Sequence, residues 1–173
     1  MDEELDKRFV GEFERVRKEL GFKPSLEQLD DIFYFRDFIQ KEGYIGTKLS
    51  RMLTGRIVST YGMWEGYLHS LLMPSSNNMP NIEESKMMEE ADRKEIMKYM
   101  IKLRAFVTKN APIGLTDDKK AEAEFFNEAV GLWDKELKAY LTRLMKKVSE
   151  GWAKNLKEQD AKVPKHKKEQ NYF

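Results

Sequence analysis

The chain contains no cysteine and only two histidines among its 173 residues. The missing cysteine excludes disulfide bonds, thiolate metal sites and a cysteine nucleophile. The scarcity of histidine limits general acid–base chemistry, because only His69 precedes the basic C-terminal end. No apolar run approaches the roughly 20 residues that span a bilayer, and the N-terminal end is too polar for a signal peptide. We therefore expect a cytoplasmic protein with no membrane-spanning segment.

The residues that are present are typical of a folded helical domain. Apolar residues make up 40% of the chain, too many for a disordered protein, and charged residues make up 35%. Lys and Arg number 31 against 30 Asp and Glu, so net charge argues neither for nor against nucleic acid binding. The length suits one domain with a real core, which we assign to residues 1–160. Residues 161–173 are assigned to a basic tail.

Apolar residues recur at helical spacing in five segments. The predicted helices are Asp2–Leu20, Ser25–Gly43, Thr47–Met73, Asn81–Lys109 and Thr116–Asp160. The loops between them are expected at Pro74–Asn81 and Asn110–Leu115, which collect Pro, Asn, Ser and Gly. Ser25 and Gln28 have the spacing of a capping box, and Asn81 is placed to cap the fourth helix. No segment shows the period-two alternation of a strand.

The last predicted helix carries a short heptad seam. The seam consists of Phe126, Val130, Trp133, Leu137, Tyr140 and Leu144, which alternate four and three residues apart. It covers only about two and a half repeats before Lys147 interrupts the pattern, so it indicates a bundle helix and not a free coiled coil. The predicted fold class is therefore all-α, a bundle of four to five helices with a long C-terminal helix.

The segment Thr47–Met73 has two distinct faces when it is wound as a helix. One face is apolar and includes Leu53, Ile57 and Leu68. The opposite face has only glycine and serine along its middle part. We interpret that second face as an interface formed by Arg51, Gly55, Ser59, Gly62, Gly66 and His69. Each glycine weakens a helix by about 1 kcal/mol relative to alanine, so we expect packing on both sides of this helix. The partner is either another part of the chain or a second copy.

Catalytic patterns are sparse in this sequence. Glu65 and His69 are four residues apart, but a helical di-iron site needs Glu-x-x-His twice, so we expect a hydrogen bond between them and no metal. Gly-x-Ser-x-Gly is absent, and Gly43–Lys48 lacks the spacing and the preceding strand of a phosphate loop. We predict no catalytic residue and no cofactor. An enzyme that uses Glu65 and His69 stays a third option.

The segment Arg56–Leu68 resembles a helix found in HEPN-type domains, through its Trp64-Glu65-Gly66-Tyr67 pattern. Those domains are all-α, often dimerise, and include RNA-cleaving toxins and RNA-binding effectors. In related families an Arg-x(4–6)-His motif follows before the last long helices. Arg104 matches the arginine, but Asn110 stands near the position of the histidine. The resemblance implies a protein that has lost ribonuclease activity, because asparagine cannot titrate near neutral pH.

Two functional hypotheses follow. The first is a non-catalytic helical interaction protein, either a homo-oligomer or a subunit of a larger assembly. The second is an RNA-binding or degenerate HEPN-like protein with nucleic acid as its partner. In the second hypothesis the phosphates are contacted by Arg104, Asn110, Lys162, Lys165, Lys167 and Lys168. The alternative interpretation of the tail lysines is that they bind no partner and form a solvated terminus.

Overall fold

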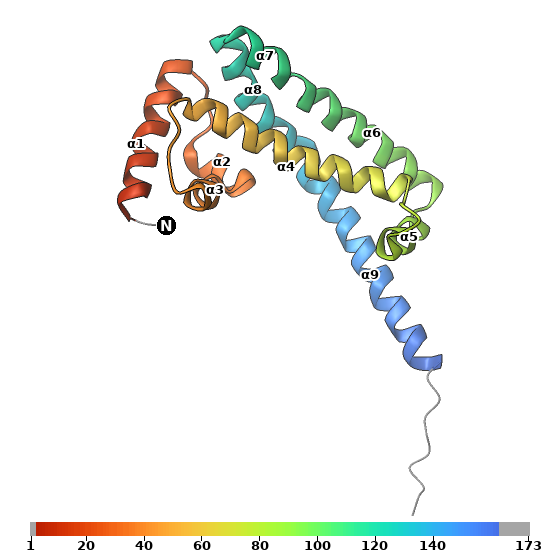
Figure 1. Ribbon diagram of the computed structural model, residues 1–173. Helices are drawn as coiled ribbons and strands as arrows, with labels where there is room; N and C mark the ends of the chain where they lie inside the picture. Colours follow the sequence, from red (N-terminus) through yellow and green to blue (C-terminus); the bar gives the residue numbers. More distant parts are fainter. Residues whose placement is uncertain (1–2, 163–173) are drawn as a thin grey trace, which may run out of the picture.

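A computed structural model describes residues 3–162 of the chain, and within that range every regular element is a helix (Figure 1). This confirms the all-α prediction and the long C-terminal helix. The elements are α1 (Glu3–Leu20), α2 (Leu26–Phe33), α3 (Phe35–Glu42), α4 (Leu49–Leu72), α5 (Met79–Lys86), α6 (Glu90–Thr108), α7 (Asn110–Thr116), α8 (Lys119–Leu132), the π-helical turn η1 (Trp133–Leu137) and α9 (Lys138–Lys162). No helix in the described range is long and apolar enough to cross a membrane.

Local signals in the sequence set several helix ends. The capping box is formed as predicted, because the Ser25 hydroxyl accepts the N–H of Gln28 and the Gln28 side chain accepts the N–H of Ser25. Asp118 accepts the backbone N–H groups of Lys120 and Ala121, and so fixes the start of α8. Asn81 does not have the capping role that we predicted. Asn78 caps α5 instead, by accepting the N–H of Asn81.

The predicted helix Ser25–Gly43 is broken in two at Tyr34. This residue adopts the left-handed conformation with φ of 54° and ψ of 53°, so α2 ends and α3 begins around it. The Asp30 carboxylate accepts the backbone N–H of Arg36 at 2.7 Å and its guanidinium at 2.9 Å, which ties the two helices together across the break. Tyrosine gives no sequence signal for this conformation, which normally favours glycine or asparagine.

Two further boundaries differ from prediction. The predicted helix Asn81–Lys109 is interrupted at Met87–Glu89, and the interruption separates α5 from α6. The predicted loop Asn110–Leu115 is the helix α7. Pro112 is tolerated there because it lies in the first turn, where a backbone N–H has no intrahelical acceptor.

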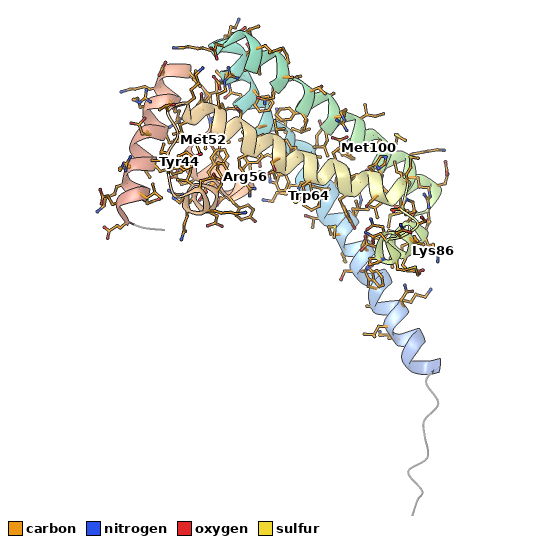
Figure 2. All side chains as sticks on the ribbon, viewed as in Figure 1. Tyr44, Met52, Arg56, Trp64, Lys86 and Met100 are labelled. Atoms are coloured by element: carbon orange, nitrogen blue, oxygen red, sulfur yellow. The ribbon has the colours of Figure 1, made fainter. Side chains whose placement is uncertain are left out.

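The helix α4 is the centre of the molecule. It packs along α6 and also contacts α1, α2, α3, α5, α7 and α8. Figure 1 shows α4 crossing in front of the α8–α9 helix, which continues away from the other helices at its C-terminal end. Figure 2 shows Met52, Arg56 and Trp64 spaced along α4. Arg56 donates a hydrogen bond from Nε to the carbonyl of Phe33 at 2.8 Å and so fixes α4 to α2.

Gly151 of α9 lies close against the break that separates α5 from α6. A Cβ added at Gly151 would collide with Sδ of Met87 and lie within about 3 Å of two further Met87 side-chain atoms. Met87 belongs to the break between α5 and α6, and its neighbour Met88 is buried. Met87 is partly buried and packs against the same core. The Met87 side chain therefore occupies the space that a Cβ at Gly151 would take, and it must shift to admit one.

Gly151→Ala should lower the free energy of unfolding by about 1–2 kcal/mol, because overpacking outweighs the better helix propensity of alanine. Gly131→Ala is the matched control, since nothing lies within 4 Å of its added Cβ. That control should be neutral or stabilising. Urea denaturation measures both, and equal stability of the two variants would show that Met87 does not restrict Gly151.

Candidate functional site

The candidate site is the outer face of α4, where Gly55, Ser59, Gly62 and Gly66 form what we call the small-residue stripe. Gly55, Ser59 and Gly66 are exposed and Gly62 is partly exposed. A Cβ added at any of the three glycines meets no atom within 4 Å. No described part of this chain covers the stripe, so the expected packing on both sides of α4 is not met within the chain.

The opposite face of α4 explains why the helix forms despite its glycines. Leu53, Ile57 and Leu68 are completely buried there, and tertiary packing of such a face supplies most of the stability of a helix in a protein. Each stripe glycine costs about 1 kcal/mol relative to alanine. Nothing within the described chain requires a glycine at these three positions, unlike at Gly151.

Apolar side chains flank the stripe on both sides. At about 100° per residue, Val58 lies on one side of the stripe and Met63 on the other. Met63 is 64% exposed, and Met73, beyond the end of α4, is 69% exposed. Val58 and Met63 were not predicted to belong to this face. Their signal in the sequence is their helical angle, which places both beside the stripe and away from the centre of the core face.

The two ends of the predicted interface differ. Arg51 donates hydrogen bonds to the carbonyl of Ile113 at 2.8 Å and to the Asp117 carboxylate at 2.7 Å, so its side chain is directed toward α7 and α8. The hydrogen bond from Arg51, together with the positive charge of Lys48, lowers the pKa of Asp117. His69 is exposed at the other end of α4.

The predicted hydrogen bond between Glu65 and His69 is not formed in the described chain. Glu65 is buried and pairs instead with Arg104 of α6, with 2.6 Å between Oε1 and the guanidinium. The i, i+4 spacing suggested the histidine, but the inward position of Glu65 turns its carboxylate toward α6. Among residues 3–157, whose side chains are described, no cluster of acidic residues and histidines could hold a metal ion.

The candidate nucleic acid residues are only partly described. Arg104 has an exposed side chain apart from its pairing with Glu65. Asn110 begins α7, and its buried Oδ1 has no hydrogen-bond partner. No hydrogen bond or ion pair joins these two residues in the described structure. Lys162 is the last residue of α9 and its side chain is not described, while Lys165, Lys167 and Lys168 lie outside the described residues.

No family model matches this chain, and neither a curated protein nor a solved structure matches it.

Proposed function

We propose that the protein is a non-catalytic helical interaction protein that self-associates through the outer face of α4. The observation that carries the proposal is the small-residue stripe, which is uncovered over about 16 Å of helix axis between Gly55 and Gly66. Three glycines weaken this helix, and no contact within the described chain requires a glycine at any of the three positions. Packing of a second helix against the stripe gives these glycines a role, because the missing side chains allow a helix separation at the short end of the usual 8–10 Å.

The order of the stripe favours a second copy of the same chain as the partner. The small residues follow each other at intervals of four, three and four, which read the same in both directions along α4. An antiparallel two-fold pairing centred between Thr60 and Tyr61 therefore sets small residues against small residues throughout. It also brings Val58 of both copies together on one side and Met63 of both copies together on the other. Two-fold pairs of this kind use the same patch on both subunits.

Light scattering on the full chain over a range of concentrations tests this proposal. The mass should approach twice that of the chain as concentration rises, because closed two-fold symmetry stops growth at two copies. A monomer at every concentration would refute self-association, and a mass that keeps increasing would refute the two-fold pairing.

RNA binding is a second candidate function. It is favoured by the ion pair between Glu65 and Arg104, because this contact joins the two segments that carry the HEPN resemblance. In this proposal Arg104 contacts phosphate with the part of its guanidinium that Glu65 leaves accessible. Asn110 offers a hydrogen-bonding group but no titratable one, so the expected activity is binding without cleavage.

A gel-shift series at increasing salt tests the RNA proposal. Arg104→Ala should weaken binding of single-stranded RNA severalfold and reduce the slope of affinity against salt by about one, as expected for one lost phosphate contact. Arg143→Ala is the matched control, because Arg143 is also an exposed arginine paired with a glutamate of α6. Absence of any shift at low salt, or equal losses in the two variants, would remove this function.

A further inference from the structure

A pocket of about 390 Å³ lies where α4 begins, between α1 and α8 and apart from the small-residue stripe. Its volume is within the range of roughly 300–1,000 Å³ that is usual for small-molecule sites. Its polar lining includes Thr47, Lys48, Ser50, Arg51, Lys119 and Glu122. Arg15, Glu19 and Asp117 also line the pocket. Glu19 pairs with Lys119 at 2.6 Å and with Arg15 at 3.3 Å, and Asp117 pairs with Arg51 at 2.7 Å and with Lys48 at 3.6 Å.

The start of α4 lies in the lining of this pocket. The first N–H groups of a helix have no intrahelical acceptor, and the N-cap residue Lys48 provides no side-chain cap. The partial positive charge at the start of a 24-residue helix adds to the charges of Lys48 and Lys119. The hydroxyl groups of Thr47 and Ser50 lie in the same lining. These groups together suit the oxygens of a small anion.

Glu122 gives an independent sign of a missing ligand. The residue is only 5% exposed, it lines the pocket, and its Oε1 has no hydrogen-bond partner. The nearest cation is the Nε of Arg51 at 3.9 Å, which is beyond hydrogen-bond distance. Arg51 is engaged by Ile113 and Asp117 instead. Burying a carboxylate oxygen without a hydrogen-bond donor costs free energy. A donor from outside the chain would remove that cost at Oε1 of Glu122.

We propose that this pocket binds a phosphoryl group that comes with an O–H donor, as in hydrogen phosphate or a small hydroxylated phosphomonoester. The negative oxygens accept hydrogen bonds from the start of α4, the hydroxyls of Thr47 and Ser50, and the ammonium groups of Lys48 and Lys119. The O–H of the ligand donates to Oε1 of Glu122. Sulfate has the same shape but carries no proton at neutral pH, so it leaves that oxygen unpaired and adds a repelling charge beside it.

Isothermal titration calorimetry of the full chain with inorganic phosphate and with sulfate, at matched ionic strength and neutral pH, tests the site. Phosphate should bind at least about tenfold more tightly than sulfate. Glu122→Gln should abolish this preference, because the glutamine amide donates to either anion. Ser50→Ala should weaken phosphate binding, and Lys41→Ala, an exposed lysine of α3 outside the pocket, should leave it unchanged.

Glycerol 3-phosphate distinguishes the two sources of the phosphoryl group. Tighter binding than inorganic phosphate assigns the site to a phosphomonoester, and weaker binding assigns it to free phosphate. No detectable binding of either compound would overturn the proposal. So would equal affinity of the unmodified chain for phosphate and sulfate, because Glu122 then plays no part in recognition.

Discussion

Gly62→Leu should convert the protein from a self-associated pair into a monomer without unfolding it. A Cβ added at this position has no atom of the described chain within 4 Å, and leucine favours the helix by close to 1 kcal/mol over glycine. In the proposed pairing the same side chain lies in the centre of the contact and forces the two α4 helices apart. We expect the dissociation constant to rise by at least about tenfold, which corresponds to about 1.4 kcal/mol.

Light scattering and circular dichroism measure this effect together. Gly11→Leu is the matched control, because Gly11 is also a helical glycine with nothing within 4 Å of its added Cβ, but it lies on α1. The control should leave both mass and helicity unchanged. A Gly62→Leu protein that is folded and has the same mass as the unmodified chain would contradict the proposed role of the stripe.

Tyr61→Ala should have the largest effect on stability, lowering the free energy of unfolding by about 3–5 kcal/mol, as for other buried aromatic residues. Tyr61 is completely buried on the inner face of α4, with edge-to-face contacts to Phe33 of α2 and Phe106 of α6. Its hydroxyl donates to the carbonyl of Ala129 in α8 at 2.6 Å. Burial raises the pKa of Tyr61 far above its ordinary value, so the hydroxyl keeps its proton and this donor role.

Tyr61→Phe separates the hydroxyl from the ring. It should cost only about 0.5–1.5 kcal/mol, because the carbonyl of Ala129 also accepts the N–H of Trp133. Tyr44→Ala is the control on an exposed tyrosine and should change stability by less than about 0.5 kcal/mol. Urea denaturation gives all three values. Equal losses for Tyr61→Ala and Tyr44→Ala would show that α2, α4, α6 and α8 do not share one core.

Regular spacing made most of the fold predictable. Phe9, Phe13 and Val16 recur at helical spacing in the predicted helix Asp2–Leu20, and all three are buried in α1. Every residue of the predicted heptad seam is buried or partly buried. Such patterns are reliable because a helix of a folded domain buries one continuous apolar stripe. The residues of that stripe therefore recur in the sequence at helical spacing.

The predictions from sequence were wrong or incomplete where contacts between residues far apart in the chain determine the local conformation or the partner of a side chain. The left-handed conformation of Tyr34 depends on the surrounding helices, not on a glycine. The π-helical turn lies inside the continuous pattern of the last helix, where the N–H of Lys138 donates to the carbonyl of Trp133. The partnership of Glu65 with Arg104 joins residues far apart in the chain and could not be read from local spacing.

The candidate site was only half predictable for a related reason. The small residues on the outer face of α4 are visible in the sequence, but the partner that packs against them is not. Small residues permit the close approach of a helix without specifying which helix it is. The unpaired oxygen of Glu122 gives no sequence signal at all. It results from the way in which Asp117 and the carbonyl of Ile113 occupy Arg51.

The central claim is that the outer faces of two α4 helices pack against each other in antiparallel orientation. The absence of cysteine allows a single spin label to be attached at Met73→Cys, an exposed position beyond the end of the stripe. Antiparallel pairing about the centre of the stripe places the two labels roughly 40 Å apart, from the rise of an α-helix and the separation of packed helices. Pulsed electron paramagnetic resonance should give that distance, and a separation near 10 Å or no dipolar signal would contradict the pairing.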